Sequence, residues 1–291
     1  AGIEAWKAGI FVDATGDADV CAAAGVPYEI GNEEMETMAP TLCFMVVNVD
    51  RKKVSDTKLV AEAIIKGKKE GRLTNPEDFR GCKDIHGPFA FTFNYNHIYG
   101  VNCLDPDDLT KAMIEGRRIA FELLDYLKEN VPGFEDAFIA STASLLGVRE
   151  TRRIKGEYYL TGEAYFKSER HEDDVCVYDY AIDLHQGKGD RQAREAYERI
   201  YYGMRTKPGE FYGIPYRCLL PVGFDNLICS GRSISCDRNM QASLRVMTAC
   251  AATGQAAGTA AALALKDACS LKSIDIGKLV ERLRQNGAYI P

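Results

Sequence analysis

Three side chains in the middle of the sequence have the types and spacing needed to bind and protonate a small acid. Arg149 and Arg152 lie three residues apart in the segment RETRR, so alternate or i+3 spacing would place both guanidinium groups on one side. Two such groups can bind a carboxylate through paired hydrogen bonds. His185, in the segment IDLH, is a candidate proton donor because imidazole titrates near neutral pH. The alternatives are a solvated charge cluster for the arginines and a structural or exposed role for the histidine.

Two glycine turns could bring backbone N–H groups close to an anion. Thr15, Gly16 and Asp17 follow the apolar run GIFVDA, and Gly231 and Arg232 follow the apolar run NLICS. A glycine turn lets backbone amides approach an anion, and an arginine can bind a phosphate or a carboxylate. The alternatives are a tight turn in which Asp17 caps the next helix, and a surface ion pair for Arg232.

Other features exclude several classes of function. The 291 residues include 36 basic and 42 acidic side chains, and the resulting net charge of -6 offers no basic field for nucleic acid or anionic lipid. No GxSxG, HExxH or CxxC segment occurs, so we predict neither a hydrolase nor a metal site. The ten cysteines stand singly, and we expect them to be packing thiols in a reducing compartment. With no apolar run of membrane-span length and no signal peptide, the sequence predicts a cytoplasmic protein with no membrane partner.

The elements that must position these residues follow from the apolar patterns. Helices are expected over residues 17–26, 55–69, 104–133, 190–204, 246–266 and 275–287. The clearest is 104–133, where apolar or small residues recur every three to four positions, whereas 17–26 and 246–266 are rich in small residues. Buried strands are expected over residues 9–16, 41–50 and 226–235, and antiparallel strands within 72–104. The two strand–glycine segments stand at opposite ends of the chain. This order is typical of one domain inserted into another, with residues 1–34 and 206–291 forming the first and 35–205 the second.

Five segments together resemble a known family. The stretches are DATGDADV, GVRETRRIKGEYYLT, DLH, IPYRCLLPVGFDNLICSGRSIS and SLRVMTACAATGQAAGTAAAL, in this order along nearly the whole chain. They resemble the FAD-dependent oxidoreductases of the glutathione-reductase-type FAD-binding superfamily. The resemblance implies a mixed α/β fold, with a Rossmann-like FAD-binding domain and an inserted substrate or cap domain of antiparallel sheet and helices.

The same resemblance implies positions for the cofactor. Thr15, Gly16 and Asp17 would lie near the phosphate or ribose of FAD, and Gly231 and Arg232 near its ribityl chain. The residues that lead into the helix at 246–266 would place the N-terminus of that helix at the N1–C2=O edge of the flavin. These residues are Ser243, Leu244, Arg245, Val246 and Met247. The alternative for this helix is a close-packed core element.

One part of the family pattern is missing from this sequence. None of the 26 glycines forms the GxGxxG turn that binds pyrophosphate at the start of such domains. We therefore expect an incomplete Rossmann-like domain in an N-terminally truncated chain. The predicted function is hydride transfer between a small organic substrate and FAD. The alternative is a non-catalytic scaffold or subunit that does not bind FAD alone, as a homo-oligomer or with a second chain that supplies the missing unit.

Overall fold

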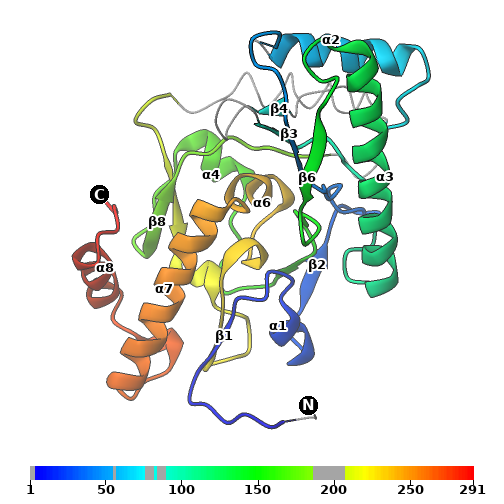
Figure 1. Ribbon diagram of the computed structural model, residues 1–291. Helices are drawn as coiled ribbons and strands as arrows, with labels where there is room; N and C mark the ends of the chain where they lie inside the picture. The colour runs from blue at the N-terminus through cyan, green and yellow to red at the C-terminus, as the bar shows by residue number, and fades with distance from the viewer. Residues whose placement is uncertain (1–3, 55–56, 76–81, 84–89, 186–206) are drawn as a thin grey trace. The chain divides into compact units, whose positions relative to one another are not determined.

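The computed structural model describes residues 4–54, 57–75, 82–83, 90–185 and 207–291. These residues form two compact units, whose segments can be followed by colour in Figure 1. The first unit contains residues 4–36, 150–185 and 207–291, and the second unit contains the described residues of 37–149. The helix expected over 190–204 lies outside the described residues.

The described strands of the first unit form three pairs. Strand β1 (Phe11–Asp13) is parallel to β10 (Leu227–Cys229), with Phe11 opposite Leu227 and Asp13 opposite Cys229. Two antiparallel pairs complete the set: β2 (Tyr28–Ile30) with β7 (Arg152–Ile154), and β8 (Asp174–Tyr178) with β9 (Tyr212–Pro215). The parallel pair joins the two ends of the chain, because strands that run the same way need a long connection between them.

Helix α7 (Met247–Lys266) packs against β1, β10 and β8. It can approach these strands closely because the residues on its inner face are small: Ala249, Thr253, Ala256, Ala257, Ala260 and Ala264. Its bounds lie within one residue of those expected from the sequence. The other helical elements of this unit are α1 (Asp19–Ala23), α4 (Gly162–Lys167), η2 (Tyr216–Leu219), η3 (Gly231–Ser233), α6 (Arg238–Leu244), η4 (Leu271–Ser273) and α8 (Ile276–Gln285).

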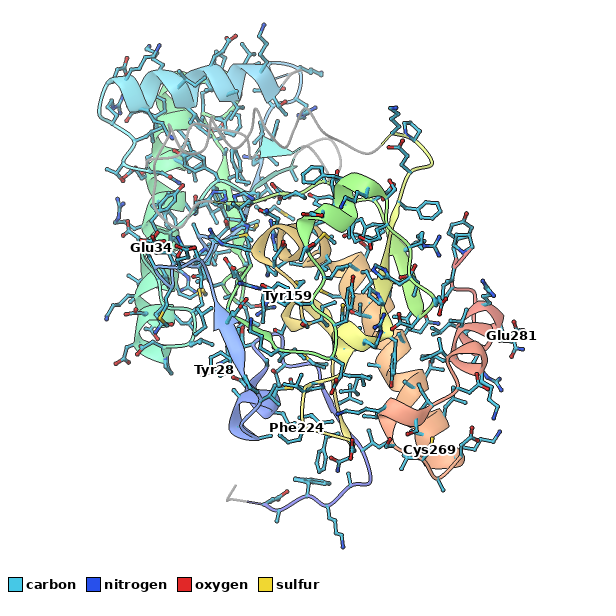
Figure 2. All side chains as sticks on the ribbon, turned by 180° about the vertical axis from the view of Figure 1, so that it is seen from behind. Tyr28, Glu34, Tyr159, Phe224, Cys269 and Glu281 are labelled. Atoms are coloured by element: carbon cyan, nitrogen blue, oxygen red, sulfur yellow. The ribbon has the colours of Figure 1, made fainter. Side chains whose placement is uncertain are left out.

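A small apolar cluster lies between α1 and the parallel strands. It contains Ala18, Cys21, Val26, Ile154, Leu227 and Cys229, all buried. Phe224, labelled in Figure 2, packs against this cluster. The cluster therefore fixes α1 to the strand pair whose ends carry the two glycine turns.

The second unit is an antiparallel sheet with two helices. The sheet has the order β4 (Cys82–Lys83), β5 (Ala90–Phe93), β3 (Phe44–Val47) and β6 (Phe138–Thr142). Helices α2 (Thr57–Lys69) and α3 (Pro106–Asn130) supply the rest of its core. The rings of Phe44 and Phe93 stack at 4.9 Å between centroids. The antiparallel strands expected within 72–104 are confirmed by β4 and β5.

Helix α3 begins and ends at residues that are typical of helix boundaries. The carboxylate of Asp105 accepts hydrogen bonds from the N–H groups of Asp107 and Asp108, and Pro106 occupies the first turn. The helix ends at Asn130, ahead of Pro132 and Gly133. Start and stop signals of this kind are local, which is why this helix was predictable.

The mixed helix and strand content, with small sheets, fits an α/β fold. Residues 150–185 cluster with the first unit, whereas the sequence placed them in the inserted domain that begins at residue 35. The pairing of β7 with β2 explains the difference, because it ties residues 152–154 to the N-terminal segment. Which unit binds a cofactor and which a substrate stays a prediction.

Candidate functional site

The parallel pairing of β1 and β10 brings the two glycine turns to the same edge. Thr15, Gly16 and Asp17 follow β1, and Gly231 and Arg232 begin η3 just after β10. Asp17 Oδ1 lies 2.7 Å from Arg232 Nη2, and the Ser233 hydroxyl donates a 2.6 Å hydrogen bond to the carbonyl oxygen of Gly16. The two turns, which the family resemblance assigned separately to two parts of FAD, are thus in direct contact. Arg232 forms an ion pair, which was the alternative to cofactor binding, but its partner Asp17 belongs to the other turn.

Gly16 is required by both conformation and space. Its φ of +83° is in the left-handed region, and a Cβ there would lie 2.7 Å from Arg232 Nη1. Any larger residue would therefore displace the Arg232 guanidinium from Asp17.

Asp13, which was not among the predicted site residues, holds the turn of Thr15, Gly16 and Asp17 through hydrogen bonds. It is 1% exposed, and its carboxylate accepts hydrogen bonds from the N–H and hydroxyl of Thr15 and from the N–H of Cys21. Burial would raise the pKa of Asp13, but these hydrogen bonds outweigh it and lower the pKa below the ordinary value. Asp13 is therefore an ionised, buried anchor for the turn.

The carbonyl and side-chain oxygens of the turn are held by residues next to β7. The Thr151 hydroxyl donates to Asp17 Oδ1 at 2.7 Å. Arg152 Nη1 donates to the carbonyl oxygen of Asp17 at 2.9 Å and to Asp19 Oδ1 at 2.7 Å. By contrast, the N–H groups of Gly16, Asp17 and Ala18 have no acceptor among the described residues. Successive free N–H groups at a turn with left-handed residues are the kind of concavity that binds anions.

The two arginines expected to share a substrate carboxylate have different partners. Arg152 contacts the turn, whereas Arg149 lies in the second unit. There its Nη1 donates to the Ala39 carbonyl and, at 2.7 Å, to the Thr41 hydroxyl, and its Nη2 lies 3.1 Å from His97 Nε2. Their role in substrate binding stays a prediction.

The first turn of α7 presents unpaired N–H groups. Val246 is the N-cap residue without a side-chain cap, and the N–H groups of Met247, Thr248 and Ala249 have no acceptor among the described residues. Met247 is 87% exposed. The Gly231 N–H donates to the Thr253 hydroxyl at 3.1 Å, which fixes η3 against this helix. The positive end of the helix dipole thus lies on the same side as the glycine turns.

The residues before α7 divide into packing residues and one cation. Ser243 and Leu244 are buried, and the Ser243 hydroxyl bonds to the Tyr212 hydroxyl at 2.8 Å and to the Tyr180 carbonyl. These contacts support a structural role for both residues. Arg245 is the residue of this group that carries charge to the start of the helix.

The charges of Arg232 and Arg245 both affect the pKa of Cys250, which lies in the first turn of α7. Burial raises the pKa of the Cys250 thiol, and the two guanidinium groups oppose this only in part, so the thiol stays protonated at neutral pH. In each arginine the Nε atom is buried without a hydrogen-bond partner. Two buried donors near a helix N-terminus are suited to an anionic or oxygen-rich ligand.

Asp183 connects Arg245 with the predicted proton donor. Arg245 Nη2 donates to the Asp183 carbonyl at 2.8 Å and to Asp183 Oδ2 at 3.0 Å, and His185 Nε2 lies 3.4 Å from the same Oδ2. Sequence reasoning selected His185 and Arg245 but not the carboxylate between them. The only signal was its place two residues before His185.

Two other kinds of feature, a metal centre and a membrane span, are absent from the described ranges. No cluster of three or more His, Cys, Asp or Glu side chains could hold a metal ion there. None of the described helices combines the length and apolar character that crossing a bilayer requires.

Comparison with known proteins gives one match. A family model described as FAD dependent oxidoreductase matches residues 1–283. No curated protein and no solved structure matches the chain.

Proposed function

Because the chain belongs to the FAD dependent oxidoreductase family, an enzyme family with FAD as its cofactor, we propose that it transfers a hydride between a small organic substrate and FAD. The observation that carries this proposal is the contact of the two glycine turns at the ends of β1 and β10, beside α7. We propose that the first unit is the FAD-binding, incomplete Rossmann-like domain and that the second unit is the substrate or cap domain. The substrate is expected to be a small molecule.

The donors and acceptors of the turns fit a dinucleotide. The free N–H groups of Gly16, Asp17 and Ala18 would meet a phosphate, and Arg232 Nε would meet another oxygen of the cofactor. Asp17 Oδ1 is held by Thr151 and Arg232, while Oδ2 has no partner among the described residues. It could therefore accept a hydrogen bond from a ribose or ribityl hydroxyl.

The first turn of α7 fits the pyrimidine edge of the flavin. Its N–H groups and the Arg245 cation would stabilise negative charge at the N1–C2=O edge. The bound cofactor supplies the two-electron chemistry. The small inner-face residues of α7 and the Gly231–Thr253 hydrogen bond hold these donors in place before any ligand binds.

Two groups are proposed to serve the substrate. His185 would hold or release a proton at its imidazole, oriented by Asp183. Arg149, in the second unit, would bind a substrate carboxylate directly or through its neighbour His97. The partners of Arg152 support a different role, in which its guanidinium holds the cofactor turn.

Retention of FAD tests the proposal directly. The purified chain is incubated with excess FAD, desalted and examined by visible absorbance, and the Kd is measured by titration. We expect a retained, shifted flavin spectrum, and Arg232→Met should weaken binding by about tenfold or more, because a charged hydrogen bond contributes roughly 1.5–3 kcal/mol. Arg217→Met is the matched control, since the Arg217 guanidinium pairs with Asp173 and lies over the Tyr158 ring, and neither residue belongs to the two turns.

Two outcomes would count against the proposal. A folded chain that stays colourless would support the alternative, a subunit that does not bind FAD alone. Equal losses from Arg232→Met and Arg217→Met would show that the two turns are not the FAD site. If FAD is retained, anaerobic bleaching by small organic acids, with a primary deuterium isotope effect at the carbon that is oxidised, tests hydride transfer.

A further inference from the structure

A single carboxylate contacts both Arg245, which precedes α7, and His185. Asp183 accepts from Arg245 through its side chain and its backbone, and its Oδ2 lies within 3.4 Å of His185 Nε2. Asp183 itself lies five residues beyond β8, whose last residue, Tyr178, bonds to Thr248 of α7 at 2.6 Å between oxygens. The end of β8 and the segment after it are therefore tied to the start of α7 and the residues just before it, through Tyr178, Tyr180 and Asp183.

The Arg245 side chain has little freedom to find another partner without leaving its place. It is 10% exposed, and its Nε is already buried without an acceptor. Removal of the Asp183 carboxylate would leave a buried guanidinium without a counter-charge, which is far less favourable than moving the cation into water. The Asp183 carbonyl would remain as an acceptor, but the carboxylate is the one counter-charge that the described residues supply to Arg245.

We propose that Asp183 is a positioning residue: it holds Arg245 at the start of α7, with His185 beside it, and so keeps in place the cation that would act on the potential of the bound flavin, without contacting the flavin. The inference rests on the proposed function, which places the flavin edge at this turn. A cation there favours the reduced, more negative flavin and raises the potential.

A double-mutant cycle separates positioning from a simple charge effect. Midpoint potentials are measured for the FAD-loaded wild type, Asp183→Asn, Arg245→Met and the double variant. Arg245→Met should lower the potential, because the cation at the start of α7 is lost while the Asp183 carboxylate stays. Asp183→Asn should leave the potential near its wild-type value, because the anion is lost and the cation moves away with it. In the Arg245→Met background, the same Asp183→Asn change should raise the potential.

If Asp183 acted on the flavin only through its own charge, the changes in potential caused by the two substitutions would simply add. If Asp183 contributed only its own negative charge, Asp183→Asn would raise the potential equally in both backgrounds, and that result would overturn the proposal. Asp173→Asn is the matched control, since Asp173 is another buried carboxylate paired with an arginine of the first unit, Arg217. It should leave the potential unchanged.

A second measurement needs no cofactor. In the ¹⁵N-labelled free chain, the Nε–H signal of Arg245, assigned with Arg245→Met, should be protected from water exchange. Asp183→Asn should abolish this protection, whereas Asp173→Asn should preserve it. Persistence of the protected signal in Asp183→Asn would refute positioning.

The two measurements test the FAD-binding function and the positioning role of Asp183 separately. Failure of the chain to retain FAD would count against the proposed function, and the ¹⁵N measurement would still decide the role of Asp183. Retained FAD with no effect of Arg245→Met on the potential would show that the flavin does not lie at α7, and the proposal would fall with that placement.

Discussion

At the scale of single residues, the buried carboxylate of Asp13 is the clearest case of a side chain that shapes a site without belonging to it. Three hydrogen bonds from Thr15 and Cys21 hold its pKa below the ordinary value. Each of these bonds requires the ionised form or an equivalent acceptor. The turn that carries Gly16 therefore depends on a charge that no solvent reaches.

Asp13 should make the stability of the protein depend on pH in acid. Because its folded pKa is lowered, its contribution is fully present above the unfolded value near 3.8 and is lost as pH falls through the folded pKa. At pH 7, Asp13→Asn should reduce the free energy of unfolding by about 1–3 kcal/mol. Urea unfolding at a series of pH values checks this.

The gap between the wild type and Asp13→Asn should narrow only below about pH 4. A gap that stayed constant down to acid unfolding would mean that the charge of Asp13 contributes nothing. Asp136→Asn is a suitable control, because this aspartate belongs to the second unit and its contact with Asn48 is made by its backbone oxygen.

At the scale of elements, the end of α7 shows a local conflict between sequence and backbone. The helix ends in a Schellman-type arrangement, in which the Cys269 N–H donates to the Ala264 carbonyl at 3.0 Å. Ala268, in the position that favours glycine, has a φ of +50° and is exposed. An alanine there costs about 1 kcal/mol of strain.

Ala268→Gly should therefore raise the free energy of unfolding by up to about 1 kcal/mol. Ala262→Gly, at an exposed position inside the same helix, should lower it by about 1 kcal/mol, because glycine is a poor helix former. Chemical unfolding of both variants gives the comparison. Destabilisation by both would show that the end of α7 does not keep the left-handed conformation.

The elements also show which parts of the fold could be predicted. Helix α3 was predictable because its apolar pattern and its caps lie within one continuous stretch, and helix α7 because its small residues form one unbroken run. Helix α1 is shorter than expected over 17–26, because Ala18 before it adopts a left-handed φ of 54° and Gly25 follows with a φ of 88°. Helix α4 has six residues and α6 has seven, which is about two turns each, so their sequences carry too little periodicity to be recognised.

The candidate site was predictable only where its residues lie in the turns themselves. The pattern of a buried strand followed by glycine identified Gly16 and Gly231 before their contact was known. Asp13, Thr151 and Asp183 were missed because their roles come from hydrogen bonds across the chain, which no local pattern encodes. Arg152 was assigned to a substrate because nothing local indicated that β7 pairs with β2 and places it at α1.

At the scale of the whole molecule, the separate cores of the two units make the effect of FAD testable by region. We expect saturating FAD to slow amide hydrogen exchange around residues 13–19, 229–233 and 246–250 of the first unit. At FAD concentrations about 100 times Kd, the slowing could reach about a hundredfold for amides that exchange through unfolding of that unit. Mass spectrometry of peptides with and without FAD measures it.

Helices α2 and α3 of the second unit provide the internal control for this experiment. Their amides should change much less than those of the two turns. Protection that was confined to the second unit would place the cofactor there and would reverse the proposed assignment of the two units.

The parallel pairing of β1 with β10 has a consequence for biosynthesis. Strand β1 leaves the ribosome before β10, and all residues from 14 to 226 must be made between the two strands. The residues from 37 to 149 can assemble their own core in the meantime. Until β10 is made, β1 has no strand to pair with. Its Phe11 and Val12 are at least one-third exposed even in the folded protein. Nascent chains stalled before residue 227 are the species in which a chaperone would find this strand.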